Sequence, residues 1–131
     1  MPTTTITLLI SPVQSRNVPP PNNMLGNMRV STDDLTQING NAGLSGQHSG
    51  FCFRVRMPNW WLCQAGYILP GIPGTPFPNG GQIEARGLLD FTPGASPGVV
   101  AITGGTGDYR SASGEVHFLD ATHWQLIIVT P

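Results

Sequence analysis

The chain has no lysine and few charged residues of either sign. Its 131 residues include six arginines and seven acidic residues, so charged side chains make up 10% of the sequence and the net charge is −1. A basic stripe that could follow a phosphate backbone is therefore missing, and nucleic acid is not an expected partner. Without lysine, the chain also cannot form a Schiff base or hold pyridoxal phosphate through one.

Metal-binding motifs and long apolar runs are absent as well. The two cysteines and three histidines show neither the CxxC nor the HExxH spacing of zinc sites, so we expect no metal and no cofactor. The apolar stretch at residues 6–10 is too short for a signal peptide or a membrane span. We therefore expect a cytoplasmic protein with no membrane partner. In that compartment Cys52 and Cys63 should be free thiols.

Glycine and proline, by contrast, are abundant, with 17 and 13 residues. They separate short segments rich in β-branched and aromatic residues, at positions 3–10, 50–57, 60–69, 83–91, 99–103, 109–119 and 123–130. The turn at residues 57–59 predicts a hairpin, and the prolines of residues 70–81 predict a loop. Further short strands are expected between residues 11 and 46. Seven or eight strands without helices predict one all-β domain over residues 1–131, either a sandwich or a closed antiparallel barrel.

A glycine-rich segment, VVAITGGTGDYRSASGEV at residues 99–116, has the spacing of a nucleotide-binding loop. Such a loop opens a helix inside a βαβ unit. Here serines, a glycine and a β-branched residue follow, and the 24 residues after Gly107 leave no room for a doubly wound sheet. We therefore interpret the segment as a corner between two strands, where glycines permit positive φ angles and close packing.

The same segment resembles the C-terminal signature of the allene oxide cyclase and dirigent barrel families. That signature is a Gly-Gly-x-Gly turn, an aromatic residue two positions later, a small residue, and then a glycine and a strand. Upstream, Gly40, Gly46, Gly50, Cys52 and Gly87 follow the order of these families, so the resemblance spans residues 33–118. It implies a closed antiparallel eight-stranded β-barrel, whose interior has room for side chains or one small ligand.

The resemblance implies three kinds of function. Allene oxide cyclases close a ring, dirigent proteins orient radicals, and small bacterial barrels similar to them catalyse Diels–Alder and related ring closures of polyketides. The first strand lacks the acidic residue of allene oxide cyclases, and the chain has no Asn-x-Ser/Thr sequon typical of the secreted dirigents. The resemblance therefore favours a cofactor-independent cyclase that folds an apolar polyene in its lumen. The alternatives are a dirigent-like or ligand-binding barrel without catalysis, and a structural subunit with a filled lumen.

The resemblance also places Cys52 in the lumen, and strand alternation then turns Arg54 and Arg56 inward. An inward arginine needs an anion or a polarised oxygen nearby. Arg54 is therefore the candidate catalytic residue, binding a substrate carbonyl, unless it is paired with Asp90 or Asp120. The candidate substrate-binding residues, which share inward-facing positions, are Cys52, Trp61, Cys63, Tyr67, Phe91, Phe118 and Asp120.

The side chains that this register turns outward on the same strand are apolar: Phe51, Phe53 and Val55. An apolar outer face is unusual for a monomer, so we expect a homodimer or homotrimer. Trp61 and Tyr67 either wall a substrate site or simply fill the barrel, Trp124 could face either way, and His117 should lie outside. The sequence leaves open whether the Pro/Asn-rich segment at residues 19–24 is a lid, which a position beside a barrel mouth would favour.

Overall fold

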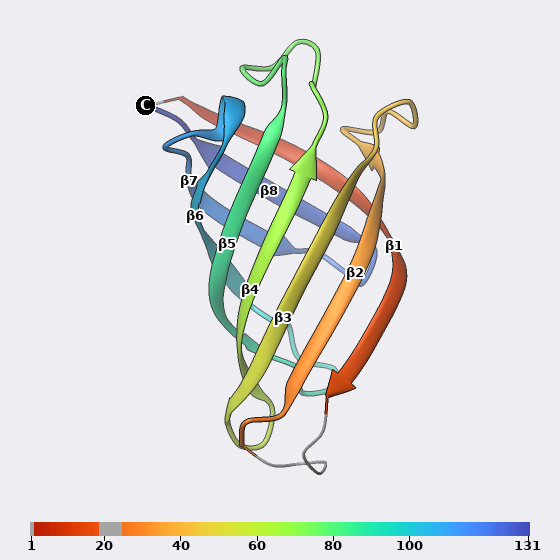
Figure 1. Ribbon diagram of the computed structural model, residues 1–131, viewed down its shortest axis with the longest axis vertical. Coiled ribbons are helices and arrows are strands. Elements are labelled where there is room, and N and C mark those ends of the chain that lie inside the picture. The colour runs from red at the N-terminus through yellow and green to blue at the C-terminus, as the bar shows by residue number, and fades with distance from the viewer. Residues whose placement is uncertain (1, 19–24) are drawn as a thin grey trace.

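The chain folds into a closed antiparallel barrel of eight strands, as expected, and not into a sandwich. The structure is a computed structural model that describes residues 2–18 and 25–131, so the segment considered as a lid lies outside it. The strands are β1 (Thr3–Val18), β2 (Met28–Ile38), β3 (Gly46–Arg56), β4 (Trp60–Leu69), β5 (Gly81–Asp90), β6 (Val99–Gly105), β7 (Ser113–Phe118) and β8 (His123–Val129). Each strand pairs with its neighbours in the sequence, and β8 closes the barrel on β1 (Figure 1).

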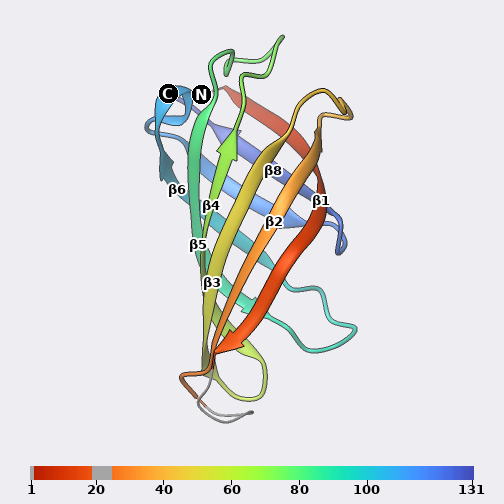
Figure 2. The same ribbon diagram turned by 45° about the vertical axis from the view of Figure 1, so that its right-hand side comes forward.

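The strands differ in length, and this shapes the barrel. β1 to β5 contain 10 to 16 residues each, whereas β6 to β8 contain six or seven. β8 therefore pairs with β1 only from Thr3 to Leu9, and the rest of β1 continues along β2 alone. In Figures 1 and 2, the long strands β1 to β5 run toward the lower end of the molecule. The loop between β5 and β6 lies in its lower half.

The upper end of the barrel, in the orientation of Figure 1, is filled by side chains. Phe77, from the loop between β4 and β5, packs on Tyr109 with 4.5 Å between ring centroids, and both side chains are fully buried. The loop is held by a hydrogen bond from the Ile72 backbone N–H to the Phe77 carbonyl, 2.9 Å long. The proline-rich segment is thus a loop, as predicted, and its apolar residues close the upper end.

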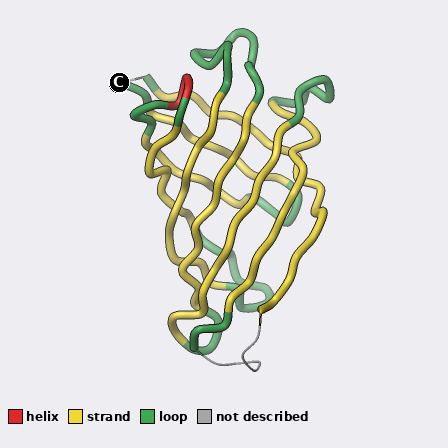
Figure 3. Tube along the Cα trace, in the orientation of Figure 1, coloured by secondary structure: helices red, strands yellow, loops and turns green. Residues whose placement is uncertain are grey.

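The glycine-rich segment forms the predicted corner between β6 and β7. The short 3-10 turn η1 (Gly107–Tyr109), coloured red in Figure 3, lies within it. The expectation of a strand from residue 109 is therefore wrong, because Tyr109 belongs to this turn and β7 begins at Ser113. Gly107 has a φ of 61°, and a Cβ atom there would lie 2.6 Å from the carbonyl oxygen of Gly80. Only glycine fits this position, because it combines a positive φ with a close backbone approach.

The outer face of β3 is apolar and exposed, as the alternation predicted. Phe51 and Phe53 are 40% and 39% exposed and pack edge to face, and Val55 is 45% exposed. Trp60 and Leu88 on neighbouring strands extend this apolar outer face. Association through it stays a prediction.

Within the described residues, the helical structure consists of η1, and no helix is long and apolar enough to cross a membrane.

Candidate active site

Arg54 points into the barrel, as strand alternation predicted. Its side chain is only 8% exposed, and Trp61 lies directly opposite it on β4. The expectation for Arg56 is wrong: the register of β3 and β4 shifts between Arg54 and Arg56, so Arg56 is exposed. A bulge adds one residue to a strand and thereby reverses the direction of the side chains that follow it.

Two nitrogen atoms of the Arg54 guanidinium are buried without a hydrogen-bond acceptor. Its Nε and Nη1 atoms have no partner, and its carbon atom Cζ lies 4.8 Å from the centre of the Trp61 ring. In the described part of the chain no carboxylate forms an ion pair with Arg54, and residues 1 and 19–24 contain no aspartate or glutamate. The expected alternative, pairing with Asp90 or Asp120, is therefore wrong. A cation in this position is costly to bury unless an anion joins it.

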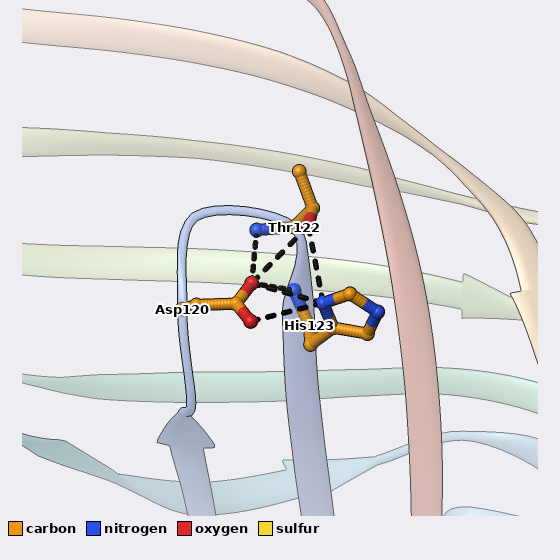
Figure 4. A network of polar contacts seen from close by, with 3 residues as sticks. All are labelled: Asp120, Thr122 and His123. Atoms are coloured by element: carbon orange, nitrogen blue, oxygen red, sulfur yellow. Dashed lines mark hydrogen bonds and ion pairs between the residues drawn. The ribbon is translucent and has the colours of Figure 1, made fainter.

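Asp120 does not face the lumen, contrary to the prediction. It lies in the exposed turn between β7 and β8, where its carboxylate accepts hydrogen bonds from Thr122 and His123 (Figure 4). The hydrogen bond from the Thr122 backbone, together with the His123 side chain, lowers the pKa of Asp120 to about 2. β7 ends at Phe118, so the alternation that was extended to residue 120 no longer applies.

Cys52 and Cys63 form a disulfide, so the expectation of free thiols is wrong. The two residues lie directly opposite each other on β3 and β4, with 4.0 Å between their Cα atoms. Both face the lumen, two residues along the strands from Arg54 and Trp61, and the bridge is therefore part of the lumen wall. Disulfides persist mainly in oxidising compartments. The cytoplasmic location stays a prediction that this bridge does not support.

A buried acid–histidine pair lies deeper in the barrel, and the sequence reasoning missed it. Asp33 on β2 and His48 on β3 are neighbours in register, and 2.7 Å separates the Asp33 Oδ2 atom from the His48 Nδ1 atom. They are 8% and 6% exposed. His48 lies four residues before Cys52 on the same strand, so the alternation used for Arg54 also indicates that it faces inward.

Aromatic rings surround this pair. The His48 ring lies 4.8 Å from that of Tyr67 and 4.9 Å from that of Trp124, which settles that Trp124 faces the lumen. The Tyr67 hydroxyl is buried and has no hydrogen-bond partner. Burial, with a smaller contribution from the Asp33 charge, raises the pKa of Tyr67, so its phenol stays protonated and able to donate.

Several inward-facing residues in the lower half of the lumen are partly exposed. Next to the acid–histidine pair, the wall from β2 to β4 consists of the small residues Ser31, Gly50 and Ala65, which are only half-buried although they share the inward face. Opposite them, Phe118 packs on Trp124 with 5.1 Å between ring centroids, and both are half-buried. Small residues on one wall and aromatic rings on the other thus line this part of the lumen, and we call the region between them the lumen slot.

The mouth of the lumen slot carries a second arginine that the sequence reasoning did not single out. Arg29 on β2 lies beside Cys52 in register, is exposed, and has its Cζ atom 5.5 Å from the centre of the Phe91 ring. Its Nε atom donates a hydrogen bond of 3.3 Å to the Ser15 hydroxyl. Phe91 also lies 6.1 Å from Trp61, so these aromatic and cationic side chains lie together at the lower end.

Two other features of the surface lie apart from the lumen slot. A groove of about 650 Å³ runs over the outer face of β2 to β4 at the upper end, and none of the predicted site residues lines it. His117, as expected, lies outside and contacts Glu115 at 2.7 Å. No group of three histidine, cysteine or acidic side chains among the described residues is placed to hold a metal ion.

Comparison with known proteins shows a similarity of fold to a solved enzyme. Neither the protein-family models nor the curated proteins provide a match. Among solved structures, a pyocyanin demethylase is similar over 96% of this chain and 100% of its own, with a TM-score of 0.72 and 26% sequence identity. The chain therefore shares the barrel fold of a small enzyme, which is compatible with a catalytic or binding role of the lumen. The assignment to the cyclase and dirigent families is supported only as far as this barrel fold.

Proposed function

We propose that this barrel is an enzyme that moves a proton on a flat, conjugated and mostly apolar substrate held in the lumen slot. The observation that carries the proposal is the buried Asp33–His48 pair, which faces the rings of Tyr67 and Trp124. A histidine oriented by a carboxylate in a water-poor site is a frequent general base in enzymes.

The geometry of the pair defines the chemistry of His48. With the Nδ1 proton donated to the Asp33 carboxylate, the lone pair of Nε2 is left free, and this nitrogen makes none of the hydrogen bonds found among the described residues. His48 Nε2 would take a proton from a substrate carbon, and Asp33 would stabilise the imidazolium that forms. The electron pair stays in the conjugated system of the substrate. Return of the proton at another atom completes an isomerisation that needs no oxidant or cofactor.

Tyr67 would assist as a hydrogen-bond donor. Its protonated phenol lies beside His48 and has no partner inside the protein. A preorganised donor of this kind stabilises developing negative charge by about 3–4 kcal/mol in comparable sites. The remaining walls would come from Trp61, Phe91, Phe118 and the Cys52–Cys63 bridge, with Asp120 no longer among them.

Ring closure, the outcome that the family resemblance implies, fits within this proposal. A polyene held folded against Trp124 and Phe118 would close a ring when proton removal makes one end nucleophilic, or by a pericyclic route that the slot shape alone favours. The likeness to pyocyanin demethylase supports a flat heterocycle as a further substrate class. Pyocyanin is therefore a useful ligand to test, by quenching of tryptophan fluorescence and by mass spectrometry for loss of a methyl group.

A probe reaction tests the base directly. 5-Nitrobenzisoxazole is a flat aromatic compound that loses its ring C–H proton to a base, breaks its N–O bond and gives a coloured nitrophenolate. We expect the protein to accelerate this reaction beyond free imidazole at equal concentration. His48→Gln and Asp33→Asn should each slow it by roughly 10²–10⁴-fold.

The control is His117→Gln, which removes the outward histidine and should leave the rate unchanged. Two results would contradict the proposal: no acceleration by the protein over imidazole, or a His48→Gln variant as fast as the wild type. Tight pyocyanin or polyene binding without acceleration would then favour the dirigent-like alternative, in which the barrel orients a ligand without catalysis.

A further inference from the structure

The second polar feature of the lumen is far from the acid–histidine pair. His48 and Arg54 share the inward face of β3 and are six positions apart. At a rise of about 3.3 Å per residue, their Cα atoms lie roughly 20 Å apart along the strand. A small substrate that reaches His48 therefore cannot also reach Arg54, and the catalytic role expected for Arg54 has to be reconsidered.

Arg54 has the properties of a residue that binds an anion. Its guanidinium is more than nine-tenths buried, Nε and Nη1 have no acceptor, and Trp61 packs against it. The indole Nε1 atom of Trp61 is also buried and unpartnered. Three unsatisfied donors in one place favour a ligand with acceptor oxygens, and a carboxylate is the group that arginine binds best in such a setting.

The lumen slot connects this site to the acid–histidine pair. Two rows of inward-facing residues separate them on β2 to β4. The inner row consists of the small residues Ser31, Gly50 and Ala65, and the outer row consists of Arg29 and the Cys52–Cys63 bridge. The aromatic rings of Phe118 and Trp124 face this path near its inner end, and Phe91 lies near its outer end. A ligand that fills the slot would be long, thin and apolar along its length.

The surrounding charges agree with a negative group at the outer end. Arg29 adds a second cation at the mouth, over Phe91. Asp33, the acidic side chain that is buried on the same lumen wall, is about three rows of residue pairs deeper and is already paired with His48. A carboxylate at Arg54 would thus meet two arginines and remain distant from Asp33.

We infer that the substrate is an elongated conjugated carboxylic acid, bound with its carboxylate on Arg54 and its reacting carbon near His48. This inference rests on the proposed function, and it makes Arg54 a substrate-binding residue that acts at a distance from the reaction. Binding energy from the remote carboxylate would hold the reactive end in place, which is a general use of non-reacting groups in substrates. Neutral compounds of the same shape would bind weakly because they leave Arg54 unpaired.

Matched pairs of ligands test the inference. All-trans retinoate and retinol are elongated polyenes that differ in the terminal group, and so are cis-parinarate and its methyl ester. Binding is measured by quenching of tryptophan fluorescence. In the wild type we expect each carboxylate to bind at least about tenfold more tightly than its neutral partner. Arg54→Met should abolish this preference and Arg54→Lys should retain part of it.

Arg86→Gln is the matched control, because Arg86 is an exposed arginine on the outer face of β5 and should retain the full preference. Thermal unfolding gives a second measurement. Retinoate should raise the unfolding midpoint of the wild type but not that of Arg54→Met, and the unliganded Arg54→Met protein should be folded and at least as stable as the wild type. A folded Arg54→Met variant excludes misfolding as the reason for its lost binding.

The inference is overturned if neither carboxylate binds better than its neutral partner, or if Arg54→Met retains the preference. Such a result would leave the proposed proton transfer intact, because the nitrobenzisoxazole assay uses a small neutral probe and depends on His48. Conversely, a strong carboxylate preference without any acceleration of that probe would support the anion site and contradict the proposed catalysis. The two failures are therefore distinguishable.

Discussion

Reduction of the Cys52–Cys63 bridge should destabilise the barrel by a calculable amount. The bridged residues are 11 positions apart in the sequence. In the chain-entropy treatment, a loop of this length removes about 9 cal/mol/K from the unfolded state, which amounts to about 2.8 kcal/mol at 25 °C. For a chain of 131 residues, the unfolding entropy of about 0.28 kcal/mol/K converts this into a lowering of the unfolding midpoint by roughly 10 °C.

The measurement is thermal unfolding followed by circular dichroism, with and without a phosphine reductant, after mass spectrometry has confirmed the redox state. Cys52→Ala/Cys63→Ala serves as the control, because its midpoint should not respond to the reductant. A shift below about 3 °C in fully reduced wild-type protein would refute the reasoning, since it would mean that the bridge hardly restricts the unfolded chain. Intact protein with two free thiols before reduction would contradict the bridge itself.

Two other predictions concern the tyrosines and the outer face. Burial raises the pKa of both Tyr67 and Tyr109, the two tyrosines of the chain. Because the pKa is raised in the folded state, the contribution of the two buried, protonated phenols to the free energy of unfolding is complete below the unfolded pKa of 10.0. It is lost as the pH rises above that value. Native protein at about pH 11 should therefore show no tyrosinate absorbance near 295 nm, whereas protein unfolded in guanidinium should show both tyrosinates, and native titration near pH 10 would contradict this. Phe53→Ser should convert an associated wild type into monomers in sedimentation velocity, because Phe53 is exposed on the apolar outer face. A monomeric wild type would show that this face is not an interface.

Local sequence patterns predicted much of the fold. The turn at residues 57–59 followed from proline placement. The outward direction of Phe51 and Phe53 and the inward direction of Arg54 followed from two-residue alternation, once the family resemblance had placed Cys52 in the lumen. The same reasoning failed at Arg56 and Asp120, because a register shift and the end of a strand interrupt the alternation, and neither leaves a clear signal in composition.

The candidate site depended on long-range pairing. The Asp33–His48 contact, the Cys52–Cys63 bridge and the small-residue wall all arise from the register of β2, β3 and β4, which places residues 11 to 19 positions apart in the sequence directly opposite each other. Alternation tells which side a residue faces but not which residue it meets, because one shift in register changes every partner.

The sequence by itself determined that this protein is all-β with an apolar interior and a glycine corner, and the family resemblance added the prediction of an inward-facing arginine. Its composition also excluded lysine chemistry, since that residue is absent. The tertiary structure decided that Asp33 and His48 are partners, that the cysteines are bonded, and that Arg54 lies far from that pair without a carboxylate of its own. The physical reason is that these properties depend on the register between the adjacent strands β2, β3 and β4, which is set by the pairing of whole strands and not by any short segment of the sequence.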